Sequence, residues 1–128
     1  MFRIPFALSL CLGLAAGAQA QDAGNGERVF AACKLCHQLG LDAKSVAGPE
    51  LNGILGRRAG AVAGFAYSAA NKSADIVWTG ETLSAFLRDP KGVMPGNKML
   101  YAGLKDDQKL ADLIAFLRQY DASGRKAP

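Results

Sequence analysis

A chain of 128 residues, half of them hydrophobic, has room for one domain with one modest core. Its 15 basic and 11 acidic residues give a formal charge of +4 at neutral pH, well short of the basic surfaces of nucleic-acid binders. Three cysteines, two of them only three positions apart, do not suit a small secreted domain stapled by disulfides.

The first twenty residues have the pattern of a secretory leader. Arg3 gives a positive start, Phe6 to Ala16 is an apolar run too short to span a bilayer, and Ala18-Gln19-Ala20 is the small-x-small pattern of a cleavage site. We therefore expect residues 1–20 to be a cleaved signal peptide and residues 21–128 to form a single domain. The expected location is the bacterial periplasm.

Helical patterns dominate the rest of the chain. Gly26 to Cys36 favours a first helix with Asn25 as its N-cap, and Ser68 to Asp75 favours a short one. Thr79 is suited to cap a further helix, which Asp89-Pro90 is expected to stop.

The strongest periodicity comes last. Leu110, Leu113, Ile114 and Leu117 follow the i, i+3, i+4, i+7 spacing of an amphipathic helix. Between the first two predicted helices, residues 38–66 are rich in glycine and show no sustained period. The predicted class is all-α, and so long a loop in a compact domain suggests that it wraps something.

The stretch Cys33-Lys34-Leu35-Cys36-His37 concentrates the reactive side chains, including the chain's one histidine. A structural zinc site needs four ligands, and no further Cys or His remains after the leader. A thiol–disulfide oxidoreductase usually carries its Cys-x-x-Cys at a strand-to-helix turn, which this chain lacks. Cys-x-x-Cys-His is the attachment signature of c-type haem: two thiols bond the porphyrin, and His37 ligates the iron. Covalent haem is therefore the favoured reading, and it would also complete the core.

The second axial position of the iron has two candidates after the leader. Met94 and Met99 both lie in a loop that contains proline and glycine. A thioether ligand favours ferrous iron and raises its potential relative to imidazole. The residues alone leave the choice between these two methionines open.

Several stretches together carry a family resemblance. From Gly24 to Tyr120 the chain resembles the small class I cytochromes c, close to the bacterial relatives of mitochondrial cytochrome c. The matching segments are CKLCH, AGPELNGILGRRAG, GFAYSAANK, PGNKM and ADLIAFLR. The resemblance implies a cytochrome c fold of about four to five short helices around one covalent haem c, with the first and last helices crossing. It also implies that Met99, which precedes Gly103-Leu104, is the iron ligand.

Further site residues follow from the same resemblance. Pro49 matches a proline whose carbonyl accepts the proton of the ligating histidine. The positions that surround the buried haem propionates match Arg57, Tyr67, Asn71 and Trp78. A buried carboxylate needs such donors.

The resemblance also implies a one-electron carrier that is monomeric and has no enzymatic role. Lys91, Lys98 and Lys105 match lysines around the exposed haem edge. They would guide brief contacts with acidic membrane complexes: a quinol–cytochrome c reductase as donor, and an oxidase, photosynthetic reaction centre or reductase as acceptor. No nucleic-acid partner is expected.

Three departures from the family pattern bear on the iron ligand. Phe86 stands where many relatives have tyrosine, Asn97 replaces a common threonine, and Tyr101 replaces a common phenylalanine. Each affects the surroundings of the Met–iron bond, and their net effect stays open. The alternative function is a haem enzyme or gas sensor, peroxidase-like, with a labile or absent methionine ligand.

Overall fold

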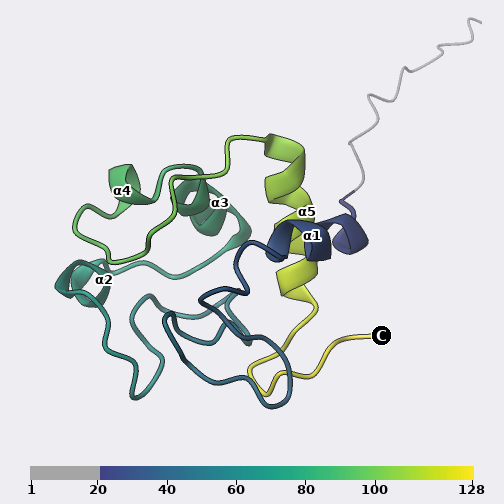
Figure 1. Cartoon of the computed structure of the whole chain (residues 1–128), viewed down its shortest axis with the longest axis horizontal. Helices are drawn as coiled ribbons and strands as arrows, with labels where there is room; N and C mark the ends of the chain where they lie inside the picture. The colour runs from purple at the N-terminus through teal and green to yellow at the C-terminus, as the bar shows by residue number, and fades with distance from the viewer. Residues whose placement is uncertain (1–20) are drawn as a thin grey trace, which may run out of the picture.

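The computed structural model describes residues 21–128, and the predicted signal peptide lies outside them. This part of the chain forms five helices and no strand, which confirms the predicted all-α class (Figure 1). Within it, no helix has the length and apolar character that crossing a membrane requires. The helices are α1 (Ala23–Phe30), α2 (Ala69–Ser73), α3 (Gly80–Arg88), α4 (Pro90–Val93) and α5 (Asp107–Arg118).

Helix α1 begins and ends earlier than the sequence predicts. Its N-cap is Asp22, whose carboxylate accepts the N–H of Asn25 at 3.0 Å, so the prediction of Asn25 as N-cap is wrong. The Asn25 side chain instead donates to Asp112 in α5 at 2.7 Å, a long-range contact that local patterns do not reveal. After Phe30 the chain continues in turns through residue 36, and the predicted end at Cys36 is too late.

Helices α2 to α4 are fixed by their caps. Ser68 caps α2, and Thr79 forms a reciprocal capping box with Thr82 at the start of α3. Asp89-Pro90 stops α3 as predicted, but it also opens α4, which the sequence analysis did not anticipate. Asp89 is the N-cap of α4 and Pro90 occupies its first turn, where the missing N–H of proline costs nothing.

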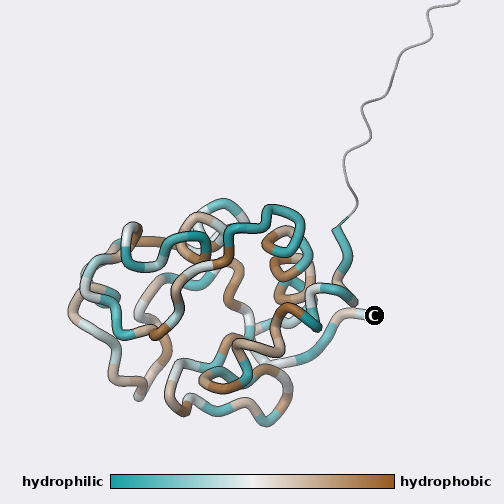
Figure 2. Tube along the Cα trace, turned by 45° about the horizontal axis from the view of Figure 1, so that its top comes forward, coloured by the Kyte–Doolittle hydropathy of each residue, from teal (hydrophilic) through white to brown (hydrophobic). Residues whose placement is uncertain are grey.

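Helix α5 crosses α1 at close range (Figure 1). Hydrophobic and hydrophilic residues alternate along the turns of α5 (Figure 2), and its apolar face is buried. The rings of Phe30 and Phe116 have centroids 5.4 Å apart at this crossing. A Cβ atom on Gly26 would lie 2.0 Å from the Asp112 carbonyl oxygen, so only glycine permits this approach. The crossing of the first and last helices, which the family resemblance implies, is confirmed.

A buried carboxylate ties the start of α1 to α5. Asp112 is 2 % exposed and accepts hydrogen bonds from the Asp22 N–H and from the side chains of Asn25 and Gln108. The Asp22 amide first, and then the two side-chain amides, lower the pKa of Asp112 below its ordinary value. The carboxylate therefore stays charged into acidic conditions.

The segment after α5 folds back on the loop that follows α1. Tyr120 and Lys126 form an isolated antiparallel bridge. Gly124 packs so tightly that an added Cβ would lie 2.1 Å from the Gly40 carbonyl oxygen. Asn52 also holds Gly40, accepting its N–H at 2.9 Å and donating to its carbonyl at 2.8 Å. The glycine-rich loop is thus anchored by the C-terminal segment.

Gly26→Ala is expected to destabilise the protein by about 1–3 kcal/mol or more, because the new methyl group collides with the backbone of α5. Denaturant unfolding of the haem-loaded protein measures the change. Gly24→Ala is the matched control: Gly24 is exposed on the same helix and meets only the Asp22 side chain at 3.3 Å. The control should leave stability unchanged or raise it slightly. Equal stability of the two variants would contradict the close crossing.

Candidate functional site

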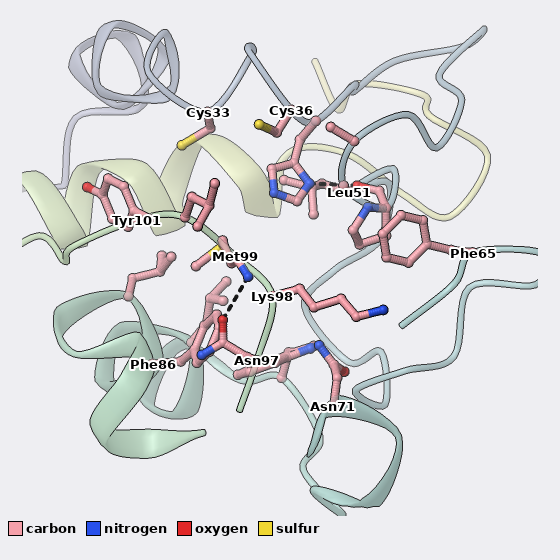
Figure 3. A pocket seen from close by; sticks show the side chains of 18 of the residues that line it. Cys33, Cys36, Leu51, Phe65, Asn71, Phe86, Asn97, Lys98, Met99 and Tyr101 are labelled. Carbon is pink, nitrogen blue, oxygen red and sulfur yellow. Dashed lines mark hydrogen bonds between the residues drawn. The ribbon is translucent and has the colours of Figure 1, made fainter. Parts of the chain in front are cut away.

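The turn after α1 brings the thiols of Cys33 and Cys36 to one cavity. The His37 N–H and the Cys36 N–H both donate to the Cys33 carbonyl, at 2.9 and 3.1 Å, so the three residues share one tight turn. Both sulfur atoms lie at the same wall of the cavity (Figure 3), and the two cysteines form no disulfide. Burial first, and then the neighbouring Cys36, raises the pKa of Cys33.

His37 is oriented by the loop that faces it. Its Nδ1 lies 2.7 Å from the Pro49 carbonyl oxygen, which accepts the ring proton. A Cβ on Gly48 would lie 2.5 Å from the ring carbon Cε1, so the backbone closes directly over the imidazole. Burial lowers the pKa of His37, outweighing the Pro49 carbonyl, which raises it. A neutral ring that donates through Nδ1 keeps the lone pair of Nε2 available to a metal.

The cavity has a volume of about 540 Å³ and mostly apolar walls. Its apolar lining comes from α1, the glycine-rich loop, α3, the loop before α5, and α5 itself: Val29, Leu51, Leu83, Phe86, Leu87, Leu104, Leu113 and Leu117. All the site residues predicted from the sequence line this one cavity: Cys33, Cys36, His37, Pro49, Arg57, Tyr67, Asn71, Trp78 and Met99.

The two candidate methionines occupy different places. Met94 follows α4, is 3 % exposed and belongs to the hydrophobic core, and it is not among the residues that line the cavity. Met99 lines the cavity, and its side chain lies near the middle of the pocket in Figure 3. Of the two, only Met99 is placed to face a group bound between it and His37.

Several residues of the lining carry polar groups. The Tyr67 hydroxyl accepts the Val62 N–H at 3.0 Å, which leaves its own proton to donate elsewhere. The side-chain oxygen of Asn71 is buried without a hydrogen-bond partner. Rotation of this amide by 180° exchanges its oxygen for its N–H₂ group, which can donate to a carboxylate. Trp78, 5 % exposed, packs its ring 5.0 Å from that of Phe86.

Arg57 is already held by protein groups. Its guanidinium donates to the carbonyls of Glu50 and Asn52 and forms an ion pair with the Glu50 carboxylate at 3.0 Å. The two side chains are only 12 % and 21 % exposed. The sequence analysis missed Glu50, although an acidic residue directly after Pro49 and seven positions before Arg57 was the available signal. The pair leaves Arg57 at the cavity with much of its charge offset.

Two of the three family departures lie beside Met99. Asn97 and Tyr101 flank it in the loop, and Phe86, the third, comes from α3 and also lines the cavity (Figure 3). Phe86 is buried and brings no hydroxyl to the site. Burial first, and then Cys33, raises the pKa of Tyr101.

The three predicted docking lysines differ in their contacts. Lys91 on α4 and Lys98 on the loop are exposed, and Lys98 also lines the cavity. Lys105 is exposed, but its ammonium donates to the Arg88 carbonyl at the end of α3. Lys105 thus has a local contact as well as a surface position.

Comparison with known proteins agrees with this geometry. The family model described as Cytochrome c matches residues 23–121. Cytochrome c2 from Blastochloris viridis is 48 % identical over 126 residues, covering 98 % of this chain and 99 % of the relative. Cytochrome c-550 from Nitrobacter winogradskyi is 45 % identical over 104 residues, covering 81 % and 95 %.

Solved structures show the same likeness. Cytochrome cH from Methylobacterium extorquens superposes with a TM-score of 0.71 at 41 % identity, covering 76 % of this chain and 97 % of that one. Cytochrome c2 from Rhodospirillum centenum gives 0.74 at 36 % identity, covering 78 % and 98 %.

A helical fold closed around an apolar cavity, with two thiols and an imidazole on one wall, defines a c-type haem protein. The chain belongs to the cytochrome c family, among its small class I members. Its cofactor is haem c, bound covalently through Cys33 and Cys36, and its biochemical class is that of an electron carrier. The residues present fit this group: apolar walls suit the ring, and the unpartnered Asn71 amide and the free proton of Tyr67 suit its carboxylates.

Glu50→Gln is expected to raise the haem reduction potential by on the order of tens of millivolts, because a negative charge beside the cavity favours the ferric form. Redox titration followed by visible absorption measures the shift. Asp75→Asn is the matched control, since Asp75 also pairs with an arginine, Arg58, but is 83 % exposed and screened by water. If the reduction potential is unchanged in Glu50→Gln, or shifts equally in both variants, the Glu50 charge does not act on the haem as expected.

Proposed function

We propose that the protein is a periplasmic one-electron carrier whose haem iron is bound by His37 and Met99. The supporting observation is that both side chains line the same cavity, while Met94 lies in the core outside it. Haem supplies a redox centre that gains and loses one electron. With His37 and Met99 both bound to it, the iron would have no coordination site left for a substrate.

The protein's own groups would keep this centre rigid. Pro49 holds the His37 ring by its Nδ1 proton, and Gly48 leaves the ring no room to turn. A ligand set that stays in place in both oxidation states needs little rearrangement on electron transfer. The mostly apolar lining excludes water, which favours the less charged ferrous form.

Donors among the residues of the cavity lining would bind the haem propionates. We assign this role to Tyr67, Asn71, Trp78 and Arg57, with Arg57 acting through a charge that Glu50 partly offsets. A buried carboxylate without such partners is costly, so these residues would decide how deeply the carboxylates lie in the protein.

Electron exchange would occur at the rim of the cavity. Lys91, Lys98 and Lys105 would attract acidic surfaces on a quinol–cytochrome c reductase and on an oxidase, photosynthetic reaction centre or reductase. Leu35 and Leu100 are 86 % and 97 % exposed. Apolar side chains of this kind give a small dry contact that separates quickly, as a monomeric carrier requires.

The proposed periplasmic location depends on the N-terminal segment, residues 1–20. Residues 1–20 would be removed during export, leaving 21–128 as the carrier. Protein recovered from the periplasm of a bacterial host that matures haem c is expected to begin at Gln21. Intact-mass measurement checks this, because the mass of one haem added to that of residues 21–128 is the expected value. A recovered chain that keeps residues 1–20 would contradict the cleavage.

Met99→Ala is expected to abolish the weak far-red methionine-to-iron absorption band and to lower the potential by roughly 200 mV, a part of the ≈ 0.8 V range that axial ligands span. Met94→Ala is the matched control: truncation of this core residue costs about 2–5 kcal/mol of stability and keeps the band. Absorption spectra of the oxidised proteins distinguish them. A wild-type spectrum without the band, with high-spin ferric iron at neutral pH, would instead indicate the haem enzyme or gas sensor with an open iron.

A further inference from the structure

The side-chain amide of Asn97 makes hydrogen bonds through both its nitrogen and its oxygen. Its Nδ2 donates to the Pro90 carbonyl at 3.0 Å and to the Met94 carbonyl at 2.8 Å. Its Oδ1 accepts the Met99 N–H at 2.9 Å, the contact drawn in Figure 3. One amide thus links α4, the turn after it and the backbone of Met99.

This triple contact depends on the amide group. A hydroxyl, as in threonine, has a single proton and can satisfy only one of the two carbonyls. An amide has two protons and an oxygen in a rigid plane, so it can serve both carbonyls and the Met99 N–H together. The presence of asparagine at this position therefore gives the loop a connection that threonine cannot make.

Little else in the described chain holds the backbone at Met99. The next backbone hydrogen bond of the loop within residues 21–128 is that of the Leu104 N–H to the Leu87 carbonyl, at 2.8 Å. Leu100, directly after Met99, is 97 % exposed and contributes almost no packing. The hydrogen bond from the Met99 N–H to Asn97 is consequently the main contact that fixes the Met99 backbone.

We propose that Asn97 is a positioning residue, which clamps the Met99 backbone and so keeps the thioether on the iron against competing ligands. The proposal rests on the proposed ligation by Met99. Without the clamp, conformers in which the loop has moved away become more populated. An external ligand then binds more tightly by the factor by which the open fraction has grown.

The test is a titration of the oxidised, haem-loaded protein with imidazole at a fixed neutral pH, followed through the loss of the far-red band. Asn97→Ala is expected to bind imidazole about tenfold more tightly than the wild type, the equilibrium effect of one or two lost hydrogen bonds. Asn97→Asp keeps an acceptor for the Met99 N–H and loses the donors. Its imidazole affinity should lie between those of the wild type and Asn97→Ala.

Asn52→Ala is the matched control. Asn52 is buried and also grips a loop backbone through both ends of its amide, at Gly40, but it does not line the cavity. Its removal is expected to lower the free energy of unfolding as much as Asn97→Ala does, with imidazole affinity unchanged. A general loosening of the fold would move the affinity of both variants equally.

The outcomes distinguish the role of Asn97 from ligation of the iron by Met99. A wild-type protein with the far-red band, in which Asn97→Ala and Asn97→Asp bind imidazole no more tightly than the wild type, would overturn the role of Asn97 alone. An equal gain of affinity in Asn52→Ala would overturn it as well. A wild-type protein that lacks the band would overturn Met99 ligation, and with it the role assigned to Asn97.

Discussion

The close crossing of α1 on α5 is the contact on which the site depends. Gly26 lets the two backbones approach to a distance that no other residue permits, and Asp112 binds the start of α1 through the Asp22 amide. The turn that carries Cys33, Cys36 and His37 leaves directly from the end of α1. The direction of that helix therefore sets where the thiols and the imidazole stand. Helix α3, which supplies another part of the cavity wall, packs against the same α5.

A second constraint is the balance of charge around the cavity. The chain places few ionised groups at the cavity, and it offsets the most deeply held one, Arg57, with Glu50. His37 is kept neutral by burial, and its proton is directed to Pro49. The mostly apolar lining of the cavity and the donors available from Tyr67 and Asn71 fit a bound group that is largely apolar but carries carboxylates. This is the amphiphilic character of haem.

Local sequence patterns predicted correctly those helix features that depend only on residues close together in the sequence. Thr79 caps α3 as expected, and the apolar period of α5 was correct, because both depend on neighbouring residues. The N-cap of α1 was misassigned because the Asn25 side chain donates a hydrogen bond to Asp112, which is distant in the sequence. Helix α4 was missed because proline was taken only as a stop signal. The gathering of the site residues in one cavity was foreseen through the family resemblance, whereas the Glu50 ion pair and the Lys105 contact depend on tertiary packing.

Both ends of the described chain are bound away from the cavity. The start is held by Asp112, and the last residues return to bridge Tyr120 with Lys126. Neither residues 21–22 nor residues 119–128 contribute to the cavity lining. A membrane tether or a second domain joined at either end would therefore start outside the cavity. The same fold can therefore be fused or immobilised, for instance on an electrode, through its termini without altering the redox centre.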